Sequence, residues 1–278
     1  MTPIAEGYDL DLLQLIPPAA VLEEMARSLH KDYVSASPYP HICLDDFLPE
    51  AVAQAVMKVF PSPSAIPWKE FRNGQERKLA SNKESDIPPT IRNLLYALNS
   101  STFLSFLEDL TGIPGLIPDP HFAGGGLHQI VRGGKLAVHI DFNRHSRLRL
   151  DRRLNLLLFL NDNWEESYLG HFELWDPEGK ACVKKALPIF NRCVIFSTSD
   201  HSYHGHPHPL QCPPDRSRKS VALYYYTNGR PQGEDMGIHG TVFAEAPRGA
   251  TVWMRSQRVA KKVICEIIPP LLLRPFRR

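Results

Sequence analysis

The sequence has little of several features that identify particular classes of protein. Its five cysteines are widely spaced and form no CxxC pair, which argues against a disulfide framework and against a structural zinc site. The formal net charge is only +2, so nucleic acid is not an expected partner. No apolar run reaches the roughly 20 residues of a membrane-spanning helix, and the first segment, MTPIAEGYDLDLLQLI, lacks the basic region of a signal peptide. We therefore expect a soluble, cytoplasmic protein without a transmembrane segment.

Helical patterns occupy the first part of the chain. Apolar residues recur at helical spacing in four segments, which are residues 21–33, 50–60, 88–99 and 101–112. A Ser-Ser-Thr cluster at residues 100–102 can cap the last of these helices. The polar stretch NGQERKLASNKESD, residues 73–86, predicts a loop.

Strand-like segments follow, each short and bounded by Gly, Asn, Asp or Pro: residues 126–134, 135–143, 154–162, 171–176, 193–199 and 219–227. Short strands without helices between them predict an antiparallel sandwich or barrel. LNLLLFL and SVALYYY are apolar on both faces, so we expect helices to cover the outside of the sheet. The predicted class is mainly β with supporting helices (α+β).

We divide the chain into four parts. Residues 1–36 form an N-terminal extension, residues 37–120 a helical support region of the main domain, and residues 121–230 the β core. Residues 231–278 form a C-terminal helical extension with a basic tail, since RSQRVAKKVICEIIPPLLLRPFRR has seven basic residues and one acidic residue.

The segment AVHIDF, residues 137–142, carries two polar groups inside an apolar run. Side chains two positions apart on a strand point to the same face, so His139 and Asp141 are neighbours. A charged carboxylate in apolar surroundings costs several kcal/mol unless it is paired. The two residues can satisfy each other through a hydrogen bond. Together with a third ligand they can instead form the facial triad that suits non-haem Fe(II).

Two later segments offer further groups. DHSYHGHPHP, residues 200–209, has four histidines directly after an apolar strand, and any one of His201, His204, His206 and His208 could supply the third ligand; a polar loop is the alternative. In SRKSVALYYYT, Arg218 and Ser220 lie two apart at the edge of a strongly apolar strand. A guanidinium there can bind a carboxylate bidentately, and the hydroxyl adds a donor; an exposed arginine at the end of a strand is the alternative.

The order and spacing of these motifs resemble a known family. The HxD pair is followed by a histidine 63 positions on (204 minus 141) and by RxS 14 positions further (218 minus 204). This set resembles the 2-oxoglutarate and Fe(II)-dependent dioxygenases, in the branch of the prolyl 4-hydroxylase catalytic domain. The resemblance covers roughly residues 37–230, and it departs at Gly170-His171, where members usually have two glycines.

The resemblance implies a double-stranded β-helix, backed by N-terminal helices, that uses Fe(II), 2-oxoglutarate and O2. His139, Asp141 and His204 match the metal ligands, and Arg218 and Ser220 match the pair that holds the distal carboxylate of 2-oxoglutarate. The implied reaction hydroxylates an unactivated C–H bond and releases succinate and CO2. Three kinds of function stay open: a hydroxylase of a small-molecule or carrier-bound substrate, a peptidyl-prolyl hydroxylase, and a catalytically silent barrel that binds a ligand or partner.

The substrate side of the site is predicted from strand geometry alone. Asn143 and His145 follow the metal strand on the same face, and His128 and Arg132 lie on the preceding strand; these four are the candidate substrate contacts. Five arginines within NRHSRLRLDRR, residues 143–153, could form a cationic rim for an anionic substrate, although a solvated loop is the alternative. Trp175, Tyr224 and Tyr226 are expected in the core.

Overall fold

Antiparallel strands curl into a nearly closed barrel in this computed structural model. The structure describes residues 15–231, 234 and 237–244, so the predicted C-terminal helix and basic tail lie outside the described residues. Within the described part, the sheet has 13 strands, and ten of them follow the order β1-β10-β7-β12-β5-β3-β6-β11-β8-β9. The other three lie beside this path, since β13 pairs with β6, β2 with β3 and β4 with β12, and every pairing is antiparallel. The predicted class, mainly β with supporting helices, is confirmed.

The strands divide between two faces of the barrel, with β3 linking them between β5 and β6. One face holds β1 (His41–Leu44), β10 (Arg192–Ser197), β7 (Asp151–Phe159), β12 (Ser217–Thr227) and β5 (Gly126–Val131). The other holds β6 (Lys135–Ile140), β11 (His204–His206), β8 (Phe172–Trp175) and β9 (Cys182–Ala186). The remaining strands are β2 (Lys69–Arg72), β3 (Glu76–Ser81), β4 (Ile117–Pro118) and β13 (Val242–Phe243).

The four predicted helices are all present: α1 (Ala19–Val34), α2 (Glu50–Lys58), α3 (Pro89–Ala97) and α4 (Ser101–Thr111). At the start of α4 the Ser100 side chain accepts a hydrogen bond from the backbone N–H of Phe103, as the capping cluster predicts. Gly112 ends this helix with φ +71°, a left-handed conformation that glycine adopts at little cost. Two short 3₁₀ turns, Glu84–Asp86 and Glu166–Tyr168, complete the helical elements of the described chain.

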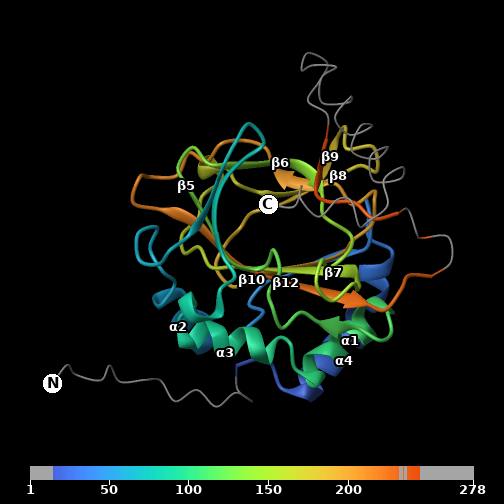
Figure 1. Cartoon of the computed structure of the whole chain (residues 1–278). Helices are drawn as coiled ribbons and strands as arrows, with labels where there is room; N and C mark the ends of the chain where they lie inside the picture. Colours follow the sequence, from blue (N-terminus) through green and yellow to red (C-terminus); the bar gives the residue numbers. More distant parts are fainter. Residues whose placement is uncertain (1–14, 232–233, 235–236, 245–278) are drawn as a thin grey trace, which may run out of the picture. The chain divides into compact units, whose positions relative to one another are not determined.

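The helices cover the outer face of the β10–β7–β12 sheet, which explains why these strands are apolar on both sides. Figure 1 shows α1 to α4 below this sheet and β6, β8 and β9 above it. On β7, the even-numbered Leu154, Leu156 and Leu158 pack in one cluster with the helices. The odd-numbered Asn155 and Leu157 line a cavity inside the barrel. Alternation along the strand therefore separates the core from the site.

One predicted loop is wrong. Residues 69–81 form a β-hairpin, since β2 pairs with β3, and β3 also pairs with β5 and β6. The strand ERKLAS has charged groups on both faces, so it lacks the apolar alternation by which strands are recognised. The error matters because β3 carries Lys78 and Glu76 into the wall of a cavity.

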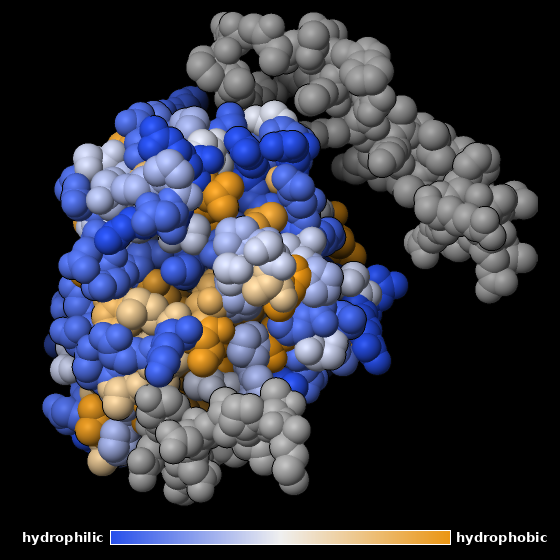
Figure 2. All heavy atoms as spheres, turned by 90° about the vertical axis from the view of Figure 1, so that its left-hand side faces the viewer, coloured by the Kyte–Doolittle hydropathy of each residue, from blue (hydrophilic) through white to orange (hydrophobic). Residues whose placement is uncertain are grey.

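On the face shown in Figure 2, hydrophobic residues gather toward the middle and hydrophilic residues surround them.

None of the helices in the described part of the chain combines the length and the apolar character needed to cross a lipid bilayer. Four cysteines of that part, Cys43, Cys182, Cys193 and Cys212, are free thiols.

Candidate active site

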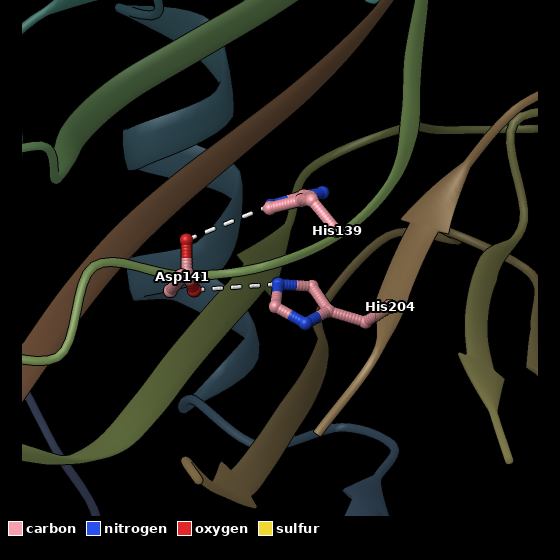
Figure 3. Close-up of side chains that lie close together, drawn as sticks. All are labelled: His139, Asp141 and His204. Carbon is pink, nitrogen blue, oxygen red and sulfur yellow. Dashed lines mark ion pairs between the residues drawn. The ribbon is translucent and has the colours of Figure 1, made fainter. Parts of the chain in front are cut away.

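The register between β6 and β11 brings two distant histidines together. His204 lies directly opposite His139 in this antiparallel pair, and their ring centroids are 4.4 Å apart. Gly205 makes the approach possible, because a Cβ at this position would lie 2.9 Å from the Leu136 carbonyl oxygen. Asp141 follows the last residue of β6 and turns back toward both rings, as Figure 3 shows.

The three side chains converge on one point. Nε2 of His139 is 3.6 Å from Oδ1 of Asp141, and Nε2 of His204 is 3.3 Å from Oδ2. The possible ligand atoms of the three residues all lie within 4.8 Å of one another. Both histidines are buried, and the Asp141 side chain is 14% exposed.

The hydrogen bonds of the imidazoles show that this arrangement fits a metal ion. Nδ1 of His139 contacts the Ala137 carbonyl oxygen at 2.8 Å, and Nδ1 of His204 contacts that of Ser202 at 2.9 Å. A carbonyl oxygen only accepts, so Nδ1 carries the proton and Nε2 of the neutral ring keeps its lone pair. Two lone pairs and a carboxylate that face one another repel unless a cation lies between them. The donor set suits Fe(II).

The electrostatics of Asp141 keep it ionised. Nδ2 of Asn155 donates to its Oδ2 at 2.7 Å, and Nη2 of Arg152 is 3.0 Å from the same oxygen. Burial acts to raise the pKa of Asp141, but Arg152, followed by the two histidines, holds that pKa well below its usual value. Burial lowers the pKa of His139, and His204 adds to this effect. Ionised carboxylate and neutral imidazole are the forms that bind metals.

A small cavity of about 70 Å³ lies beside the triad, deep in the barrel. Arg218 and Ser220 of β12 line it, and both are buried. Nε of Arg218 donates to the Gly170 carbonyl at 2.7 Å, and its guanidinium carbon lies 4.7 Å from the centroid of the Phe159 ring. Among the described residues no carboxylate lies within ion-pair distance of Arg218, and burial lowers its pKa to about 9. The side chain is therefore an unneutralised buried cation that can bind an anion.

A second cavity of about 270 Å³ meets the first at His139 and Asp141. The β2–β3 hairpin and the segment before and within β13 form much of its wall, with Lys69, Phe71, Glu76, Lys78, Thr241 and Phe243. Lys78 reaches both cavities and lies 3.1 Å from Glu76. The His-Asp-His triad thus lies between a small deep cavity and a larger one whose wall includes the hairpin.

The four predicted substrate residues do not share one location. His128 lines both cavities, and burial, assisted by Lys78, lowers its pKa to about 3. Asn143 instead holds the segment before β13 through hydrogen bonds with Gly237 and His239. His145 is 1% exposed, with Nε2 3.3 Å from Asp119. Arg132 donates to the Cys212 carbonyl. These positions argue against direct substrate contact by Asn143, His145 and Arg132.

The structure also shows where the arginine-rich stretch, His171 and the clustered histidines lie. The arginine-rich stretch does not form a simple rim, because Arg152 is fully buried and Arg153 pairs with Glu234. His171, which stands where the family usually has a second glycine, pairs with Glu166 at 2.6 Å and lines neither cavity. Of the remaining histidines in the cluster, His201 and His208 are exposed and His206 is buried.

Sequence reasoning missed four groups around the site: Lys78, Arg152, Asn155 and Tyr224. Tyr224 is buried in a core cluster, as predicted, and it also lines both cavities and donates to the Gly124 carbonyl. Its sequence signal was available, because Tyr224 lies four positions after Ser220 and so shares its face of β12. Asn155 lies two positions before Leu157 on β7, so both side chains point to the inner face of that strand.

The comparisons agree with this geometry. The model of the 2OG-Fe(II) oxygenase superfamily matches residues 125–226. No curated protein matches the sequence. One similar solved structure is a prolyl hydroxylase from Trichoplax adhaerens in complex with a peptide fragment of the hypoxia inducible factor oxygen degradation domain; it has 17% identity and TM-score 0.50, over 74% of this chain and 91% of that one.

Two further structures are similar. A prolyl 4-hydroxylase from Phytophthora capsici has 16% identity and TM-score 0.53, over 93% of this chain and 77% of that one. HygX from Streptomyces hygroscopicus, with nickel, 2-oxoglutarate and hygromycin B bound, has 10% identity and TM-score 0.51, over 79% of this chain and 97% of that one. At such identities the similarity establishes the fold.

The matched segment contains β5 to β12, and with them both histidines, Asp141, Arg218 and Ser220. Fe(II) and 2-oxoglutarate are the cofactor and the cosubstrate after which the matched superfamily is named. Residues 125–226 therefore match the model of the 2OG-Fe(II) oxygenase superfamily, and the barrel is similar in fold to those of the prolyl hydroxylases named above.

Proposed function

We propose that this protein hydroxylates an unactivated C–H bond of a small-molecule or carrier-bound substrate. His139, Asp141 and His204 hold Fe(II), and Arg218 with Ser220 holds the distal carboxylate of 2-oxoglutarate. One observation carries the proposal: a converging His-Asp-His donor set adjoins a cavity that contains a buried arginine without a carboxylate partner. A metal site alone would leave the guanidinium unexplained, because a buried cation without a partner is costly.

In this proposal the small cavity holds the keto acid and the larger cavity holds the substrate. When bound, ferrous iron activates O2, and the keto acid supplies electrons as it is converted to succinate and CO2. Arg218 and Ser220 orient the keto acid in the small cavity, where Phe172 and Leu157 exclude water. The substrate occupies the larger cavity, so that its reacting carbon lies near His139 and Asp141.

The volume of the larger cavity, about 270 Å³, suits a substrate that is a small molecule or the single side chain of a larger one. Two ammonium groups lie near one aromatic ring in its wall, since Nζ of Lys69 and of Lys78 are 4.8 and 5.0 Å from the Phe71 ring centroid. Lys78 is paired with Glu76, so it is the ammonium of Lys69 that supports a substrate with an anionic group. Peptidyl-prolyl hydroxylation by the same residues is the alternative substrate class.

The direct test is succinate release from 2-oxoglutarate under O2 with Fe(II), followed by a mass-spectrometric screen of metabolite extracts for the gain of one oxygen atom. His204→Ala should abolish both signals, and His208→Ala, at an exposed position of the same cluster, should leave both unchanged. Proline-containing peptides in the same screen distinguish the alternative substrate class. A wild-type protein that binds no iron and releases no succinate would favour a silent binding module instead.

A further inference from the structure

His206 faces the small cavity, although nothing in the triad requires it. It lies two positions after His204 on β11, and it lines this cavity with Arg218, Ser220 and His128. The residue is 4% exposed, so its imidazole is shielded from bulk solvent.

The hydrogen bonding of His206 differs from that of the other histidines at the site. His139, His204 and His128 each use one ring nitrogen to contact a backbone carbonyl oxygen. Neither Nδ1 nor Nε2 of His206 has a hydrogen-bond partner among the described residues. Buried polar atoms are nearly always partnered in native proteins, so this ring is expected to have a ligand that the protein itself does not provide.

The charge around the ring indicates what kind of ligand this is. Arg218 lies in the same cavity without a carboxylate partner among the residues that the structure describes, and Lys78 reaches the same space. The acidic group in the cavity wall is Asp141, which is already engaged by Arg152 and Asn155. Lys78 is paired with Glu76, so the guanidinium of Arg218 and an imidazole N–H donor are the groups that suit a small anion in this volume.

We propose that His206 is a binding residue for 2-oxoglutarate, whose distal carboxylate accepts a hydrogen bond from its ring N–H beside Arg218 and Ser220. This inference rests on the proposed function, because it assumes that the keto acid occupies the small cavity. It adds a specificity element: the cavity holds the second carboxylate through three residues on two strands, β11 and β12, and so selects dicarboxylic over monocarboxylic keto acids.

Calorimetric titration of the nickel-loaded protein tests the proposal, because nickel holds the keto acid without turnover. His206→Val removes the N–H and should weaken 2-oxoglutarate binding about tenfold, the scale of one hydrogen bond to a charged group. Pyruvate, which lacks the distal carboxylate, should bind the variant and the wild type equally. Nickel affinity should stay unchanged, His206→Gln should recover part of the loss, and His208→Val provides the matched control.

Unchanged 2-oxoglutarate affinity in both His206→Val and His206→Gln would overturn the inference, as would an equal loss for pyruvate or a loss of nickel affinity. A second variant, Arg218→Met, distinguishes a failure of the inference about His206 from a failure of the proposed function. If Arg218→Met loses 2-oxoglutarate while His206→Val does not, only the inference is wrong. If the wild-type protein does not bind 2-oxoglutarate at all, the proposed function is wrong and the inference with it.

Discussion

Arg152 places a fully buried guanidinium against Asp141, with Nη2 3.0 Å from Oδ2. The guanidinium carbon also lies 3.4 Å from the centroid of the Tyr224 ring and 4.5 Å from that of Phe142. Its Nε donates to Oδ1 of Asn155, whose Nδ2 donates to the same Asp141 oxygen. Two neighbouring groups therefore hold Oδ2, which also faces His204, while Oδ1 faces His139.

Arg152→Met should lower metal affinity at least about tenfold, because groups that orient a ligating carboxylate commonly contribute this much. Methionine keeps much of the packing on Tyr224, so the loss reports the charge and not a cavity. Titration with nickel measures the effect. Arg153→Met is the control, since Arg153 pairs with Glu234. Equal metal affinity in Arg152→Met and the wild type would show that Arg152 does not orient Asp141 for metal binding.

Arg218→Met should raise the 2-oxoglutarate concentration needed for half-maximal succinate release about 100-fold, because a buried bidentate contact to a carboxylate is lost. The iron requirement should change far less, since Arg218 is not a ligand. Lys219→Met changes the next residue, which lines neither cavity, and should leave both requirements unchanged. Equal effects of Arg218→Met on iron and keto acid would count against the assignment.

Gly170→Ala should weaken 2-oxoglutarate binding, because the Gly170 carbonyl orients Arg218. Gly170 has φ +79°, and an added Cβ would lie 2.4 Å from Cδ2 of Leu210 and 3.2 Å from Cδ of Arg218. The left-handed backbone alone costs about 1 kcal/mol of folding stability for a residue with a side chain.

Gly229→Ala is the matched control, since Gly229 has φ +94° and open space around it. Calorimetry should show a raised Kd for Gly170→Ala, and chemical denaturation should show a larger loss of stability in Gly170→Ala than in Gly229→Ala, because only the former adds close contacts to the backbone cost. The same keto-acid affinity in both would mean that the Gly170 carbonyl does not position Arg218.

Tyr225→Phe should lower the free energy of unfolding by about 1 kcal/mol, the usual net contribution of a buried hydrogen bond. The Tyr225 hydroxyl is buried and donates to the Leu98 carbonyl at 2.9 Å, which ties β12 to the end of α3. Packing of the ring against Phe103 is retained. Urea denaturation measures the change. An unaltered midpoint would show that another donor, such as water, replaces the hydroxyl.

Much of the fold could be predicted because its elements follow simple periods. Ser100 and Gly112 bound α4 by local backbone chemistry, and the apolar runs of β7 and β12 required cover on both faces. The β2–β3 hairpin could not be predicted in this way. Its charged residues are accommodated by a cavity, and a cavity exists only once distant strands have paired.

The positions of Asn143 and His145 differ from those predicted for a related reason. Strand parity places Asn143 and His145 on the face of His139, but β6 ends at Ile140 and the chain then turns. After that turn His145 is buried against Asp119, and Asn143 binds the segment before β13. Periodicity describes side-chain direction only while the strand continues.

The sequence by itself determined which groups are available to the site: HxD, the distal histidine and RxS, in that order. Tertiary structure decided which of the four clustered histidines faces His139, because this depends on the β6–β11 register and on the close approach at Gly205. It also decided the roles of Arg152, Asn155 and His206. Their directions follow from the closure of the barrel, and closure is a property of pairings between strands that are far apart in the chain.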